Sequence, residues 1–141
     1  MRLNPYLNFN GQCEAAFQLY QKVLNGKNLQ MFRFADMPPS DEMPIPISAR
    51  QQIMHASMEV GAAVLMGSDN PHPGFQPAQG FAVSLNMDSA EEAERVFAAL
   101  SEGGQVTMPL AQTFWALRFG MFTDRFGTPW MINCEQERCS D

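Results

Sequence analysis

The sequence has few of the residues that build metal sites, disulfide frameworks and nucleic-acid surfaces. Its three cysteines, Cys13, Cys134 and Cys139, follow no CxxC spacing, so we expect neither a disulfide framework nor a thiolate zinc site. It has two histidines, and nine Lys and Arg stand against fifteen Asp and Glu. The net charge of −6 comes without a clustered basic stretch, so nucleic acid is not an expected partner.

Long hydrophobic runs are also missing. The longest uncharged apolar run, residues 61–67, is far too short to cross a bilayer, so no membrane partner is expected. Residues 1–5 lack the apolar core of a signal peptide, which favours a cytoplasmic location. An apolar fraction of 45% and a charged fraction of 17% are typical of a folded globular protein. A chain of 141 residues is expected to form one domain.

Hydrophobic periodicity predicts the same order of elements twice: a strand, a helix and three strands. Asn25-Gly26 should end the first helix, and Asp88 or Ser89 should cap the second. The Pro-rich loops 37–51 and 68–79 are either lids or plain insertions. The predicted strands are 3–9, 28–35, 53–60, 62–67, 81–87, 105–111, 114–124 and 128–134, and the predicted helices are 13–24 and 90–100.

The two halves can be aligned with each other. Laying residues 6–26 over 84–104 with a single-residue gap matches Leu7 to Leu85 and Val23 to Leu100. The apolar phase and the order of elements agree between the halves. We therefore predict a tandem βαβββ repeat of class α+β, with module one at 1–70, module two at 80–135 and loop 68–79 between them.

Three stretches carry a resemblance to a known family. They are "NPYLNFNGQCEAAFQLYQKVL", "IMHASMEVGAAVLMGSDN" and "GGQVTMPLAQTFWALRFGMFTDRFGTPWMIN". Together they resemble the PhnB-like branch of the vicinal-oxygen-chelate superfamily, which includes glyoxalase I, extradiol dioxygenases, and fosfomycin- and bleomycin-resistance proteins. The resemblance implies two βαβββ modules with curled mixed sheets around a cavity, and a homodimer.

The resemblance also locates a metal site. Metal-using members hold one divalent ion with His, Gln or Glu from the first and last strands of each module. In this sequence those positions fall on Asn4 or Pro5, Met66 or Leu65, Ala82, and Met131. Because such sites need imidazole or carboxylate ligands, we expect the metal, and any cofactor, to be absent. The alternative is a relocated site built from His55, Asp69 and His72.

A polar face alternates with an apolar one along several strands. Ligand sites are mostly apolar with a few placed polar groups. If the apolar faces pack under the helices, the polar faces can line the cavity, with tryptophans as flat walls. The candidate ligand-binding residues are Tyr6, Asn8, His55, Ser84, Asn86, Trp115 and Trp130.

Two functional classes follow. One is a small-molecule-binding protein without chemistry. The other is a metal-independent enzyme, such as a lyase or isomerase, that uses His55 or Glu59 as acid or base. Each candidate also has a structural explanation: a hydrogen-bonded His55, a solvated Glu59, and tryptophans in the core or a dimer interface. Cys13 begins a helix, which can lower a thiol pKa, but a packing role is simpler.

Some relatives in this branch are labelled as ubiquinone-pathway methyltransferases. A methyl donor such as S-adenosylmethionine usually needs a Gly-rich turn from a strand into a helix. Here the Gly pair in "EGGQ", residues 102–105, follows a predicted helix instead. Methyl transfer is therefore not expected, and no Lys or Arg cluster indicates phosphonate binding.

Overall fold

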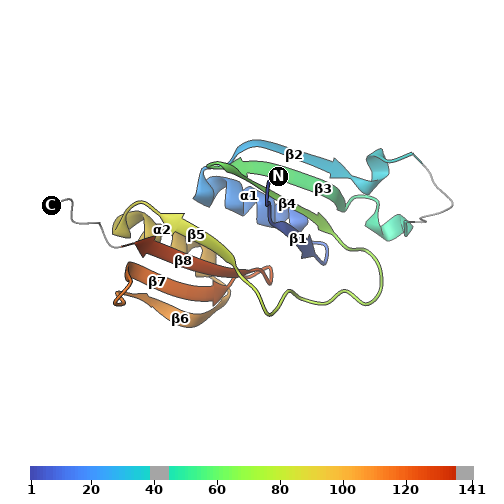
Figure 1. Ribbon diagram of the computed structural model, residues 1–141. Coiled ribbons are helices and arrows are strands. Elements are labelled where there is room, and N and C mark those ends of the chain that lie inside the picture. The colour runs from blue at the N-terminus through green and yellow to red at the C-terminus, as the bar shows by residue number, and fades with distance from the viewer. Residues whose placement is uncertain (39–44, 136–141) are drawn as a thin grey trace. The chain divides into compact units, whose positions relative to one another are not determined.

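The computed structural model describes residues 1–38 and 45–135, and the chain divides into two compact units, Met1–Pro77 and Ala78–Asp141. Each unit has one four-stranded sheet and one long helix (Figure 1). Within these residues, no helix combines the length and apolar character needed to span a membrane. Part of loop 37–51 and Cys139 lie outside the described residues.

Unit 1 is the first βαβββ module. Its sheet has the order β1-β4-β3-β2, with β1 parallel to β4 and the other pairs antiparallel. Short 3-10 helices occur at Phe34–Asp36 and Ile47–Ala49. The elements are β1 (Tyr6–Phe9), α1 (Cys13–Leu24), β2 (Lys27–Arg33), β3 (Ile53–Val60) and β4 (Ala63–Asp69).

Unit 2 repeats this topology. Its sheet order, β5-β8-β7-β6, again has one parallel pair, β5 with β8. The predicted α+β tandem repeat with mixed sheets is therefore confirmed, and both sheets are open rather than closed barrels. The elements are β5 (Val83–Met87), α2 (Ala90–Ser101), β6 (Gln105–Ala111), β7 (Ala116–Thr123) and β8 (Pro129–Glu135).

Local signals set the helix ends. Asn25 adopts the left-handed conformation after α1, with φ of 54°, and the backbone N–H of Gly26 donates to the carbonyl of Gln21. At the start of α2, the hydroxyl of Ser89 accepts the backbone N–H of Glu92 at 3.2 Å. The prediction for the first strand was too long, because only Tyr6–Phe9 pairs with β4 as a strand.

Each helix covers one face of its own sheet. In unit 1, Phe17 and Tyr20 of α1 are fully buried together with Phe9 and Met58. Gly67 is needed for this packing, because a Cβ there would lie 2.8 Å from the ring of Phe17. In unit 2 the corresponding core contains Val96, Leu100, Phe122, Trp130 and Ile132. The opposite face of each sheet is not covered by the helix of that unit.

Candidate functional site

We define open face 1 as the face of the unit 1 sheet that points away from α1. One row of paired residues crosses all four strands, and shorter rows lie beside it. These rows are Tyr6–Met66–Ser57–Gln30, Asn8–Ser68 and His55–Phe32, with Val64–Glu59–Lys27 towards one end. Tyr6, Asn8 and His55 lie on this face, as alternation predicted.

Tyr6 and His55 are in direct contact. The Tyr6 hydroxyl lies 3.3 Å from His55 Nδ1, and the ring centroids are 5.8 Å apart. Tyr6 comes from β1 and His55 from β3, so the tyrosine side chain reaches across β4, which lies between them. When the hydroxyl donates to Nδ1, the imidazole carries its proton on Nε2. The pair offers a phenol and an imidazole side by side.

Glu59 is held differently. Its carboxylate accepts a hydrogen bond from the side-chain amide of Asn28 at 2.6 Å. Asn28 has a φ of 53° and lies beside a register shift in β2. Glu59 is exposed near the hairpin end of β3, which agrees with the solvated role considered for it. His55 is therefore better placed than Glu59 among the other polar groups of open face 1.

We define open face 2 as the face of the unit 2 sheet that points away from α2. Sequence analysis found its β5 residues, Ser84 and Asn86, but missed most of the others. Alternation along β7 and β8 was the signal that could have found them, because Phe119 and Met121 pair directly with Asn133 and Met131. The two complete rows are Ser84–Met131–Met121–Met108 and Asn86–Asn133–Phe119–Ala111.

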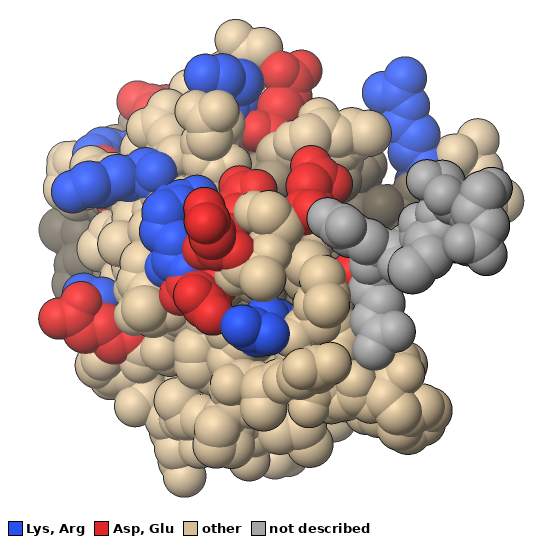
Figure 2. All heavy atoms as spheres, turned by 90° about the vertical axis from the view of Figure 1, so that its left-hand side faces the viewer, with Lys and Arg blue, Asp and Glu red and all other residues tan. Residues whose placement is uncertain are grey.

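Open face 2 combines apolar side chains with an amide pair. Asn133 Nδ2 donates to Asn86 Oδ1 at 3.0 Å, and Asn133 Oδ1 is buried with no hydrogen-bond partner in the described part of the chain. The eight residues of the two rows include no Asp, Glu, Lys or Arg. Figure 2 shows one side of the molecule, and the lower part of that side carries no Lys, Arg, Asp or Glu.

The two tryptophans lie in different places. Trp115, 49% exposed, stacks edge-on against Phe119 with centroids 5.4 Å apart, so it borders open face 2. Trp130 is only 1% exposed, and its indole N–H donates to Asp124 Oδ2 at 2.8 Å. The predicted place of Trp130 on the cavity wall was wrong. Trp130 of β8 pairs with Phe122 of β7, and Phe122 packs on Phe97 of α2, so both residues lie on the face that α2 covers.

The residues at the superfamily's metal positions do not fit a divalent ion. In unit 1, Asn4 Oδ1 already accepts the backbone N–H of Val64 at 3.2 Å, and Met66 offers only a soft thioether. In unit 2, Ala82 has no ligating atom, and Met131 is again a thioether. Hard or borderline ions are bound by imidazole and carboxylate groups, which these four positions lack.

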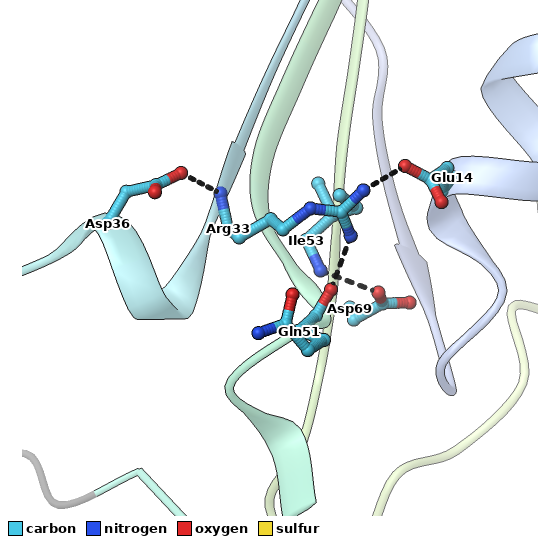
Figure 3. Close-up of polar contacts among 6 residues, drawn as sticks. All are labelled: Glu14, Arg33, Asp36, Gln51, Ile53 and Asp69. Atoms are coloured by element: carbon cyan, nitrogen blue, oxygen red, sulfur yellow. Dashed lines mark hydrogen bonds and ion pairs between the residues drawn. The ribbon is translucent and has the colours of Figure 1, made fainter.

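The relocated metal site is contradicted by the geometry of its three residues. Asp69 is 3% exposed, and its two carboxylate oxygens accept the backbone N–H groups of Cys13 at 3.0 Å and Ile53 at 2.9 Å. Figure 3 shows the bond from Ile53. Asp69 therefore faces α1, whereas His55 contacts Tyr6 on open face 1. Among the residues that the structure describes, no three His, Cys, Asp or Glu side chains gather as metal ligands.

The surroundings of Cys13 suppress its reactivity. Burial raises the pKa of the Cys13 thiol far above its ordinary value, and the negative charges of Asp69 and Glu14 raise it further. The helix N-terminus does not reverse these effects. Cys13 is thus a neutral packing residue with no exposed surface, and the alternative of a reactive thiol is wrong.

Arg33 forms a polar junction that the sequence analysis did not identify. Its guanidinium pairs with Glu14 of α1 and donates to the carbonyl of Gln51, while its backbone N–H donates to Asp36 (Figure 3). These contacts connect β2 to α1 and to the segment that precedes β3. Since the Arg33 and Glu14 side chains are 37% and 40% exposed, the ion pair serves local order more than stability.

Three comparisons find known proteins or families that are similar to this chain. The family model described as Glyoxalase/Bleomycin resistance protein/Dioxygenase superfamily matches residues 2–132. Protein YjdN of Escherichia coli strain K12 is 35% identical over 147 residues, which cover 98% of this chain and 98% of the relative. The crystal structure of protein PA1353 from Pseudomonas aeruginosa is 50% identical, with a TM-score of 0.84 and coverage of 97% and 99%.

A PhnB protein from Bacillus cereus is a further structural neighbour, with a TM-score of 0.75, 20% identity, and coverage of 95% and 99%. Its name also includes a methyltransferase activity, but a likeness at this identity shows the fold alone. In this chain, Gly103 and Gly104 follow α2 and precede β6, which is not the strand-to-helix turn that a methyl donor uses. From its fold, its matched residues and its relatives, the chain belongs to the Glyoxalase/Bleomycin resistance protein/Dioxygenase superfamily.

Proposed function

We propose that this protein is a PhnB-like member of the superfamily that binds a small molecule on the open faces of its sheets without the superfamily's metal ion. The observation that carries the proposal is the chemistry of the four metal positions, where thioether, methyl and an already bonded amide replace imidazole and carboxylate. The open faces support binding, because they join apolar side chains to a few placed polar groups.

The first test measures metal and ligand together. Mass spectrometry of protein purified without chelator or affinity metal should find less than about a tenth of an equivalent of any transition metal per chain. Small molecules are then screened by the rise in Tm that binding to the folded state produces. A stoichiometric ion that survives dialysis would overturn the metal-free proposal.

The second candidate function is acid–base catalysis at His55, favoured by the Tyr6 hydroxyl 3.3 Å from its imidazole. A compound found in the screen separates the two functions. If the protein only binds it, the compound is recovered unchanged. If the protein is an enzyme, the compound is converted, and His55→Ala stops the conversion while leaving Kd within a few-fold.

We also propose that the protein is a homodimer that uses the β6 edge. β6 carries no charged residue, Val106 on it is exposed, and Phe114 and Trp115 are exposed nearby. An exposed, uncharged edge strand is a template on which a strand of another chain can pair. Light scattering is expected to give twice the chain mass of 15.8 kDa, and Val106→Lys should shift the protein to the monomer. A wild-type monomer at micromolar concentration would contradict the proposal.

A further inference from the structure

We propose that open face 2 selects a neutral aromatic ligand that carries a carboxamide or lactam group. The inference rests on the proposed function, since it names the chemical class that this face would accept. Three independent features of the face lead to it: the composition of its apolar row, the absence of charge, and the hydrogen-bonding state of its amide pair.

The apolar row favours a flat, polarisable group. Met131, Met121 and Met108 are consecutive partners across β8, β7 and β6, so three thioether side chains lie next to one another. Phe119 occupies the neighbouring row, with Trp115 edge-on against it. Methionine sulfur makes favourable contacts with aromatic rings and adapts to their outline, and aromatic side chains add stacking or edge contacts. An aromatic ring fits this surface better than a sugar or a polyol.

Charge decides between ligand types of similar shape. The two rows of open face 2 contain no ionisable side chain of either sign. In the neighbouring part of β7, Arg118 is already paired with Glu94 of α2 at 3.1 Å. Placing a carboxylate or an ammonium ion on this face would remove its water without supplying a counter-charge, which is costly. The bound part of the ligand is therefore neutral, despite the chain's net charge of −6.

The amide pair defines the polar group. The N–H···O bond between Asn86 and Asn133 uses one hydrogen of Asn133 Nδ2 and one lone pair of Asn86 Oδ1, whereas Asn133 Oδ1 is buried below the reach of a ligand on this face. The exposed Asn86 keeps both hydrogens of its Nδ2 and a second lone pair on its Oδ1, so its amide can donate and accept at once. Exchanging oxygen and nitrogen in both amides still leaves one donor and one acceptor to satisfy. A carboxamide supplies both in return, whereas an ether or ketone can only accept.

The probe for this inference is benzamide, compared with benzoate, benzylamine and toluene. Backbone amide signals of β7 and β8 in ¹⁵N-labelled protein report binding by NMR. Benzamide should bind at least about tenfold more tightly than each comparator, the ratio expected for a satisfied polar pair. Asn133→Leu should remove this preference, and Met121→Ala should weaken all four probes. Arg95→Gln, on the exposed side of α2, is the matched control and should change neither.

The outcomes separate the inference from the proposed function. If all four probes shift the β7 and β8 signals with similar affinity, the face binds small molecules but the amide selection is wrong. If benzoate or benzylamine binds best, the neutral-ligand argument is wrong. If no probe moves these signals, binding on open face 2 fails altogether. Should Asn133→Leu not fold, Asn86→Ala at the exposed partner tests the same hydrogen bonds.

Discussion

Replacing Asp124 by alanine is expected to lower the free energy of unfolding by about 4 kcal/mol, because the variant leaves several buried donors without an acceptor. Asp124 is 3% exposed, and its Oδ1 accepts the backbone N–H groups of Phe126 at 2.9 Å and Thr128 at 3.0 Å. Its Oδ2 accepts the indole N–H of Trp130 at 2.8 Å. One carboxylate therefore fixes the β7–β8 turn and orients the largest core side chain of unit 2.

Denaturant titration of Asp124→Ala measures this effect, with a fall in Tm of roughly 10 °C as the thermal counterpart. Asp124→Asn separates the turn from the tryptophan, because an amide can accept on one side only and must present N–H to the other. A double-mutant cycle with Trp130→Phe, which removes the indole donor, should give a coupling free energy of about 1–2 kcal/mol between the two side chains. Additive losses would show that the Asp124–Trp130 bond does not carry the stability assigned to it.

Local chemistry made much of the fold predictable. The helix at 13–24 was predicted with both ends correct. Its C-terminal end was predictable because Asn25 can adopt the left-handed conformation that ends a helix, and Gly26 follows it. The second helix begins where Ser89 can accept a backbone N–H, as predicted. These signals act within four residues and do not depend on the rest of the chain. The repeated topology followed from the same local elements placed in the same order.

The candidate site was less predictable because it depends on which face each strand position takes. Trp130 and Met131 are neighbours in sequence, yet the register of β8 buries the first and leaves the second on open face 2. Sequence alternation separated the two residues but did not say which face α2 covers. Register shifts in β2 and β6 further break the alternation along those strands. The methionine row became visible only when β8, β7 and β6 were aligned with one another.

Asp69 shows how a candidate ligand becomes a structural residue once its partners are known. It ends β4, and its oxygens accept N–H groups from the first residue of α1, Cys13, and the first residue of β3, Ile53. A negative charge at this helix N-terminus is also favourable. As a metal ligand, by contrast, Asp69 would need free lone pairs directed towards His55, and the two side chains lie on opposite faces of the sheet.

Asp69→Ala is accordingly expected to cost about 3 kcal/mol of unfolding free energy in metal-free protein, since two buried N–H groups lose their acceptor. Asp69→Asn should lose somewhat less, because its amide oxygen can still accept one of them. The matched control is Asp36→Ala, where water can replace the acceptor at an exposed 3-10 helix, and its loss should be much smaller. A ligand role predicts a different pattern: divalent ions would stabilise the wild type, Asp69→Ala would abolish that response, and metal-free stability would hardly change. The buried geometry of Asp69 favours the first pattern, because its acceptor capacity is already directed at the backbone that joins α1, β3 and β4.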